Sequence, residues 1–177
     1  RALLRLGRRP DAEQAFTEGH WPGLRLVVAM VSREEKEVKS RDGMRSTVET
    51  SPYYPAWVKT AESEIAPALA AIRARDLKAI GEVAERNAWR MHATALAADP
   101  PLCYLQSATL LVIQALEIER RAGRPMYFTL DAGPNPVILT DEANEASAVE
   151  VAKECGVIDV VRCQSGGDAR LVTAHLF

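Results

Sequence analysis

The sequence has few cysteines, little net charge and no long apolar run. Its 177 residues include only 3 cysteines, none of which forms a C-x-x-C pair, and this argues against both a disulfide framework and a zinc site. Twenty-two basic and 24 acidic residues leave a formal charge of −2, too small to recruit nucleic acid or an anionic membrane surface. The longest apolar run, residues 24–31, is far short of a membrane span. We therefore expect a cytoplasmic protein with neither nucleic acid nor membrane as a partner.

Motifs that usually hold a nucleotide or present a nucleophilic serine are also missing. The sequence contains no G-x-x-x-x-G-K-S/T loop, no G-x-G-x-x-G after a strand and no G-x-S-x-G elbow. It also lacks the alternation of aromatic and basic residues that suits single-stranded nucleic acid. A nucleotide site of these kinds is therefore not expected in this chain.

What remains is the composition of one globular domain, with 47% hydrophobic and 26% charged residues. Residues 1–23 show no sustained period, so we interpret them as an edge element and linker, with the domain proper at 24–177. Apolar and β-branched residues predict a strand at 24–32. The charged stretch 32–51 indicates a loop that runs into a short helix near residues 44–49.

Three helices are expected in the middle of the chain. Small and apolar residues at helical spacing predict a helix at 55–73, and Pro67 is expected to kink or restart this helix. Asp76 has the chemistry of an N-cap for the next helix, which runs to about Ala95. A third apolar stripe predicts a helix at 104–122.

Four strands and one more helix complete the prediction. In chain order these are strands at 126–130 and 137–139, a helix capped by Asp141 that runs to about Glu154 and is stopped by Gly156, and a hairpin of strands 157–163 and 170–176. The order of elements is that of an α+β fold. We expect an antiparallel or mixed sheet with helices packed on one face.

The segment LDAGPNPVILT, residues 130–140, is the first candidate for chemistry. It places Asp131 at the end of a strand, where a scaffold holds a side chain fixed and reachable. Gly133 lets the backbone turn or approach a ligand closely, and Pro134 and Pro136 stiffen the exit on either side of Asn135. From composition alone, a plain hairpin turn with an incidental acid is the favoured interpretation.

A second candidate lies in the charged loop. Lys36, Lys39, Ser40 and Arg41 offer ammonium, hydroxyl and guanidinium groups, which suit a phosphate or diphosphate because Arg grips two oxygens at once. Four acidic residues are interleaved with them, so a solvated charged loop is the competing interpretation.

Two further features are weaker. His92 lies next to an apolar stripe and has no second histidine three to five residues away, so the two-histidine metal pattern is absent. We interpret it as a structural residue that supports the site. Residues 164–168, which include Gly166-Gly167, indicate a hairpin loop rather than a phosphate loop.

Three strings give the sequence a specific likeness. KSRDGMRSTVETS (39–51), RNAWRMHATALAADPPLCYL (86–105) and YFTLDAGPN (127–135), in this order and separation, resemble the carboxy-terminal half of the diphosphomevalonate decarboxylases, which belong to the GHMP kinase superfamily. The likeness extends from about residue 21 to 139 and is nearer to the bacterial form. It implies the α+β fold of the GHMP kinase carboxy-terminal domain.

The resemblance also implies an activity. Members of this family use ATP and Mg²⁺ to convert mevalonate 5-diphosphate to isopentenyl diphosphate, ADP, phosphate and carbon dioxide, a step of isoprenoid biosynthesis. The family's Gly/Ser-rich nucleotide loop, substrate lysine and catalytic arginine belong to an amino-terminal half that has no counterpart here. ATP and Mg²⁺ are therefore expected to bind mainly to that missing half, and no metal ligand is assigned in this chain. The first residue is Arg rather than Met, so we expect a processed, trimmed or partial chain.

The resemblance assigns roles to individual residues. Asp131 matches the acid that faces the tertiary hydroxyl of the substrate, orients it and accepts its proton. Ser40 and Arg41 match a serine-arginine pair that contacts the phosphate or carboxylate groups of the substrate, and Lys36 and Lys39 are compatible with a diphosphate. The candidate supporting residues are Gly133, Asn135 and His92. Family members are commonly homodimers, which exposed helices permit without requiring.

Three functions stay open from sequence. The first is the carboxy-terminal, substrate-side part of a diphosphomevalonate decarboxylase, inactive without its upstream half. The second is a phosphomevalonate decarboxylase or mevalonate 3-kinase on the same scaffold, because the phosphate count of the substrate depends partly on residues outside this chain. The third is a non-catalytic module that binds a small phosphorylated molecule.

Overall fold

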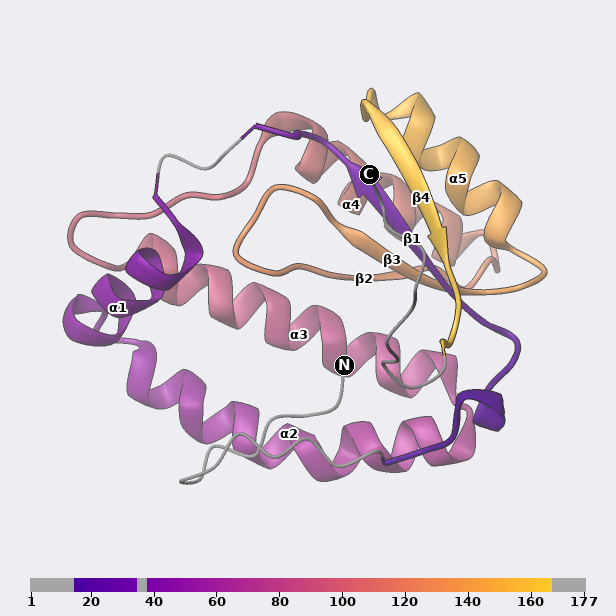
Figure 1. Ribbon diagram of the computed structural model, residues 1–177, viewed down its shortest axis with the longest axis horizontal. Helices are drawn as coiled ribbons and strands as arrows, with labels where there is room; N and C mark the ends of the chain where they lie inside the picture. The colour runs from indigo at the N-terminus through magenta and orange to yellow at the C-terminus, as the bar shows by residue number, and fades with distance from the viewer. Residues whose placement is uncertain (1–14, 35–37, 167–177) are drawn as a thin grey trace, which may run out of the picture.

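A four-stranded sheet organises the chain in the computed structural model, which describes residues 15–34 and 38–166 (Figure 1). The elements, in chain order, are η1 (Glu18–His20), β1 (Leu24–Met30), α1 (Ser40–Thr50), α2 (Tyr54–Ala74), α3 (Leu77–Leu96), α4 (Ser107–Arg121), β2 (Tyr127–Thr129), β3 (Val137–Asp141), α5 (Glu145–Glu154) and β4 (Asp159–Cys163). The predicted strand at 170–176 lies outside the described residues. None of the described helices is long and apolar enough to cross a membrane.

The strands are ordered β2-β3-β1-β4, and every described pairing is antiparallel. β1 lies between β3 and β4, with Val27 opposite Ile138 on one side and Arg162 on the other. Phe128 of β2 in turn lies opposite Ile138. The predicted α+β fold is therefore confirmed, and the sheet is antiparallel rather than mixed.

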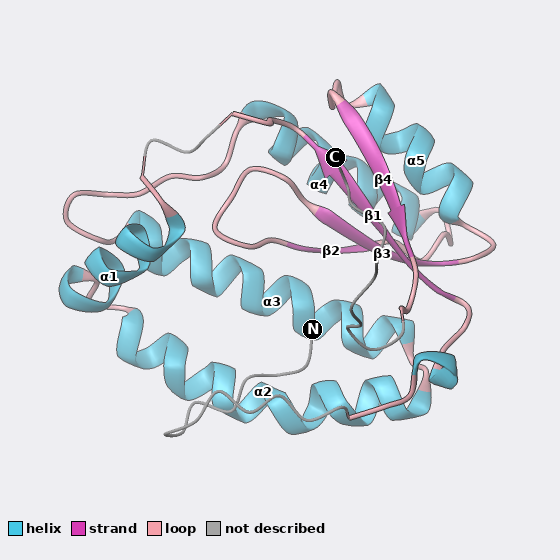
Figure 2. Cartoon of the chain, in the orientation of Figure 1, coloured by secondary structure: helices cyan, strands magenta, loops and turns pink. Residues whose placement is uncertain are grey.

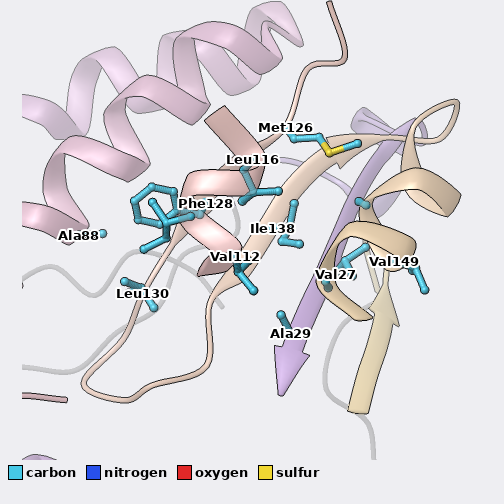
Figure 3. Packing of buried hydrophobic residues seen from close by; sticks show 13 residues of the cluster. Val27, Ala29, Ala88, Val112, Leu116, Met126, Phe128, Leu130, Ile138 and Val149 are labelled. Carbon is cyan, nitrogen blue, oxygen red and sulfur yellow. The ribbon is translucent and has the colours of Figure 1, made fainter. Parts of the chain in front are cut away.

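One face of this sheet carries the hydrophobic core (Figure 3). In β1 the side chains alternate, so that Val27 and Ala29 are fully buried while their neighbours are only partly covered. They pack with Phe128 of β2, with Ile138 of β3 and with side chains of α4 and α5, including Val112, Leu116 and Val149. Each large apolar side chain buried in this way stabilises the fold by about 1.5–3 kcal/mol. The covering of this face by helices was predicted.

Helix α3 lies along β2, at the edge of the sheet (Figure 2). The approach is close, because a β-carbon on Gly81 would lie only 2.1 Å from the Tyr127 ring. Glu85 of α3 accepts hydrogen bonds from Phe128 N at 3.2 Å and from Arg120 Nη1 at 2.7 Å. Burial raises the pKa of Glu85, and the Arg120 guanidinium opposes that shift. The carboxylate thus joins β2, α3 and α4.

Helix α2 packs on α3, on the side away from the sheet (Figure 2). Its buried Glu64 accepts from Arg86 Nε at 3.0 Å and from Arg90 Nη1 at 2.6 Å. Pro67 was predicted to kink or restart the helix; the restart does not occur, because α2 continues through Pro67. Pro67 and Ser63 are both exposed, so water can solvate the carbonyl group that the proline leaves without a donor.

Two other boundaries differ from the predictions. Asp141 is not the N-cap of α5: it is the last residue of β3, paired with Leu24, and its Oδ1 accepts from Asn144 N at 2.9 Å. Helix α4 begins at Ser107 rather than at 104, where Gln106 N donates to Thr109 Oγ1 at 3.2 Å. In both cases a hydrogen bond from a side chain to the backbone fixes the boundary of the element. The spacing of apolar residues, from which the boundaries were predicted, carries no information about such a bond.

Candidate functional site

The turn between β2 and β3 brings an acidic side chain to the surface. Leu130 is buried after the end of β2, and the next residue, Asp131, is exposed. Gly133 and Pro136, further along the turn, are buried again. The prediction that Asp131 lies at a strand end and remains reachable agrees with this geometry.

Two donors hold the backbone carbonyl of Asp131. Gly133 N lies 2.7 Å from this oxygen, and His92 Nε2 of α3 lies 3.1 Å from it. A carbonyl oxygen only accepts, so the contact requires the proton of a neutral His92 on Nε2. The side chain of His92 is 1% exposed, and this burial lowers its pKa against the opposing effects of the hydrogen bond and of the Asp131 charge.

The middle of the turn is held by α4. Thr109 Oγ1 donates to the Pro134 carbonyl at 2.6 Å, and the Thr109 side chain is fully buried. The same oxygen accepts from Gln106 N at the start of α4. On the sheet side, Ala29 N donates to the Pro136 carbonyl at 2.9 Å. The turn is therefore attached to a helix start and to the central strand.

The side chain of Asn135 fastens the turn to the chain that leaves β1. Its Oδ1 accepts from Val31 N at 2.8 Å and from Ser32 N at 3.0 Å, while its Nδ2 donates to the Ser32 carbonyl at 3.0 Å. Both polar ends of the amide are used on backbone groups, so Asn135 contributes to the site through backbone position.

The second candidate group lies at the start of α1. Lys39 precedes the helix, and Ser40 and Arg41 are its first two residues, with all three side chains exposed. The helix dipole favours an anion at such an N-terminus, and the two cations add to that preference. Helix α1 begins four residues earlier than the predicted residue 44, so Ser40 and Arg41 belong to a helix rather than to a loop. Lys36 lies outside the described residues.

The two candidate groups lie at the same end of the molecule (Figure 1). Between them is Tyr104, whose ring meets the His92 ring edge-on with 6.2 Å between centroids. A β-carbon on Gly43, in the first turn of α1, would lie 2.0 Å from the Tyr104 hydroxyl oxygen. The first turn of α1 is thus separated from the His92 that holds Asp131 by a single aromatic side chain.

Sequence reasoning did not identify Thr109 or Tyr104. Thr109 lies three residues after the N-cap Gln106, at a position where a side chain can accept from the N-cap backbone, and this pattern was visible in the sequence. Tyr104 lies within one of the strings that carry the resemblance, but nothing in its spacing indicates a contact with α1.

The described part of the chain has no cluster of potential metal ligands. No group of three or more His, Cys, Asp or Glu side chains in that part of the chain could hold a metal ion. The donors present at the site, one carboxylate and a set of cations, do not by themselves form a magnesium site. No chemical step is therefore assigned to a metal held by these residues.

The family model and the curated relatives that match this chain point to the same family. Residues 26–165 match the model of the mevalonate 5-diphosphate decarboxylase C-terminal domain. Bovine diphosphomevalonate decarboxylase is 34% identical over 160 residues, which cover 84% of this chain and 39% of the bovine protein. The chain thus spans well under half of that relative's length.

Solved structures agree with the sequence matches. Mevalonate diphosphate decarboxylase from Staphylococcus aureus is 34% identical, with a TM-score of 0.78 over 85% of this chain and 46% of that one. A structure of MDDEF in complex with MVAPP, AMPPCP and magnesium is 33% identical, with a TM-score of 0.77 over 86% of this chain and 47% of that one. The chain belongs to the mevalonate 5-diphosphate decarboxylase family and corresponds to its C-terminal domain.

Proposed function

We propose that this chain is the substrate-side part of an ATP-dependent decarboxylase that converts mevalonate 5-diphosphate to isopentenyl diphosphate, ADP, phosphate and carbon dioxide. The observation that carries the proposal is the exposed Asp131 carboxylate on a firmly held turn, at the same end of the molecule as the cationic start of α1. The chain spans under half of its curated relatives, so turnover is a property of a longer polypeptide.

The start of α1 binds the anionic groups of the substrate in this proposal. Arg41 presents a planar fork that pairs with two phosphate oxygens, and Ser40 adds a hydroxyl donor and backbone amides. Lys39, and Lys36 beyond the described residues, supply the further positive charge that a diphosphate requires. The match to the family model, which covers residues 26–165 and so includes Ser40 and Arg41, supports this assignment.

Asp131 orients the tertiary hydroxyl of the substrate and accepts its proton. A carboxylate is a weak base for an alcohol, but a loose phosphoryl-transfer transition state requires a positioned nucleophile more than a deprotonated one. The hydroxyl oxygen attacks the terminal phosphoryl group of ATP, and the O–P bond to ADP breaks.

Decarboxylation follows from that phosphorylation. The new phosphate leaves with the C–O bonding pair, and the electron pair of the bond to the carboxylate then forms the alkene as carbon dioxide departs. The negative charge of Asp131 stabilises the positive charge that develops at the same carbon. One residue thus serves both steps through a single fixed position.

The supporting residues act on the backbone of the turn. Neutral His92 donates to the Asp131 carbonyl, Gly133 N donates to the same oxygen, and Asn135 attaches the turn to the exit of β1. None of these three contacts the substrate in the proposal. Each restricts the direction in which Asp131 can point.

Nucleotide and metal are assigned to the upstream half. The MDDEF complex holds AMPPCP and magnesium, and this supports ATP and Mg²⁺ as the cofactors of the whole enzyme. When bound, Mg²⁺ offsets the charge of the ATP phosphates during transfer. We also propose a cytoplasmic enzyme that forms a homodimer.

The test is ADP release by the complete polypeptide, with mevalonate 5-diphosphate and 5-monophosphate compared side by side. Strong preference for the diphosphate, with release of carbon dioxide, is expected. Preference for the monophosphate would indicate a phosphomevalonate decarboxylase, and ADP release without carbon dioxide a 3-kinase. No release with either substrate would contradict the enzymatic proposal and leave a binding module.

A further inference from the structure

The first turn of α1 is seated directly on an aromatic side chain. A β-carbon on Gly43 would lie 2.0 Å from the Tyr104 hydroxyl oxygen, 3.4 Å from Tyr104 Cζ and 3.3 Å from Leu102 Cδ1. The first of these distances is shorter than any real contact, so only glycine permits this approach. The hydroxyl of Tyr104 is buried, and burial raises its pKa.

Tyr104 also contacts His92, the residue whose ring bonds the Asp131 carbonyl. The Tyr104 ring meets the His92 ring edge-on, at 76° and 6.2 Å between centroids, and His92 Nε2 contacts the Asp131 carbonyl. A continuous series of contacts therefore runs from Gly43 through Tyr104 and His92 to Asp131. One end of the series is the first turn of α1 and the other is Asp131, and both have a proposed role in binding the same substrate.

The loop that carries Tyr104 is itself attached at several points. Asp99 N donates to Thr50 Oγ1, at the far end of α1, at 2.8 Å. Leu102 N donates to the Ala95 carbonyl, in the last turn of α3, at 3.0 Å. The loop between α3 and α4 therefore contacts both the first and the last turn of α1, and it is also bonded to α3. Because of these attachments, the loop cannot simply move away when a side chain is added at Gly43.

We infer that Tyr104 is a positioning residue that sets the separation between the N-terminus of α1 and the Asp131 carboxylate. The inference rests on the proposed function, in which one substrate presents its diphosphate to α1 and its tertiary hydroxyl to Asp131. A spacer between the two groups sets how well both ends of the substrate fit at once. An error of about 1 Å in such a fit costs on the order of 10²-fold in rate.

The contact geometry provides a rescue experiment. In the complete polypeptide, Gly43→Ala introduces a methyl group against the Tyr104 hydroxyl, whereas Tyr104→Phe removes that oxygen and leaves Cζ as the nearest ring atom at 3.4 Å. The double variant thus removes the overlap that the single Gly43→Ala creates. Gly19→Ala serves as a matched control, because a β-carbon there meets nothing within 4 Å.

We expect Gly43→Ala to lower kcat for mevalonate 5-diphosphate about 10- to 100-fold, with KM changed less than about threefold, because the diphosphate still binds α1 while the hydroxyl is misplaced. The double variant should return kcat to within about threefold of Tyr104→Phe alone. Gly19→Ala should match the wild type.

Two results would overturn the inference. One is a folded Gly43→Ala protein with wild-type kcat, and the other is a double variant as impaired as Gly43→Ala alone. A purely structural contact would lower the melting temperature while leaving kcat per folded molecule unchanged, and this also counts against it. Failure of the proposed function is seen separately, because the wild type itself would then release no ADP with mevalonate 5-diphosphate.

Discussion

The two groups of the candidate site are built in opposite ways. The turn at 131–136 is held by backbone and side-chain hydrogen bonds from α3, α4 and the exit of β1, and its buried supports include His92 and Thr109. The start of α1 instead exposes Lys39, Ser40 and Arg41 on the first turn of a helix. One group has a fixed backbone and a single carboxylate, and the other has long, adjustable cationic side chains.

The difference matches two different tasks: the turn positions the Asp131 carboxylate, and the start of α1 attracts the diphosphate. An acid that orients a hydroxyl loses rate when it moves by a fraction of a bond length, so its backbone needs many attachments. Charges that attract a diphosphate act over several ångströms and tolerate rotation of the side chain. Substitutions in the turn should therefore lower kcat, and substitutions of the exposed cationic side chains at the start of α1 should raise KM.

The largest expected effect is that of Asp131→Asn in the complete polypeptide. The amide keeps the size of the carboxylate but loses its charge and its ability to take a proton, so decarboxylation should fall by about 10³-fold or more. Steady-state kinetics with mevalonate 5-diphosphate measure the loss, and ATP affinity and the circular dichroism spectrum should be nearly unchanged. Turnover at the wild-type rate would remove Asp131 from the mechanism.

Asn135→Ala should come next, because it weakens the attachment of the turn itself. The variant loses three hydrogen bonds and leaves backbone groups of Val31 and Ser32 without these contacts, at an expected cost of about 2–4 kcal/mol in the free energy of unfolding. Urea denaturation measures it. Asn87→Ala is the matched control, since its amide makes one longer contact, 3.3 Å to Glu64. Equal costs for the two variants would contradict the role given to Asn135.

Arg41→Ala tests the opposite side of the comparison. Loss of a bidentate phosphate contact should raise KM for mevalonate 5-diphosphate about tenfold, with kcat within about twofold of the wild type. Arg121→Ala, which removes another exposed arginine at the end of α4, is the control and should change neither constant. An unchanged KM in Arg41→Ala would show that α1 does not bind the substrate.

The smallest effect concerns pH and His92. Burial holds the pKa of folded His92 below its ordinary value of 6.5, so the unfolded chain binds this proton more readily. The contribution of His92 to stability is therefore present above pH 6.5 and is lost as the pH falls through the lower pKa of the folded state. His92→Gln keeps a donor for the Asp131 carbonyl without ionising, so its free energy of unfolding should fall less between pH 7 and 5. Parallel pH profiles for the two proteins would argue against a neutral buried His92.

The sequence predicted those elements that depend on local chemistry. Asp76 accepts from Ala79 N at the start of α3, as its position before an apolar stripe indicated. Gly156, with a φ of 79°, follows the end of α5 at Glu154 as predicted. The strands at 24–32 and 126–130 were found from apolar and β-branched content, with small errors at their ends.

The errors and omissions depend on contacts between distant segments. The first turn of α1 was assigned to a loop because it is polar and contains Gly43, and it is packed on Tyr104, about sixty residues later in the chain. The candidate site shows the same limit. The position of Asp131 at a strand end followed from the sequence, whereas its connections to His92 and Thr109 arise only when α3 and α4 meet the turn.

The Glu85 carboxylate has a consequence for association between molecules. Among the strands that the structure describes, β2 lies at an edge of the sheet and is three residues long. A backbone amide at a sheet edge can pair with a strand of another chain. Glu85 occupies the amide of Phe128 with an inward-pointing charge, and α3 lies along the same strand. The short length of β2, the partly buried charge of Glu85 and the covering helix α3 together protect this edge against aggregation, so dimer assembly through strand addition at β2 is disfavoured.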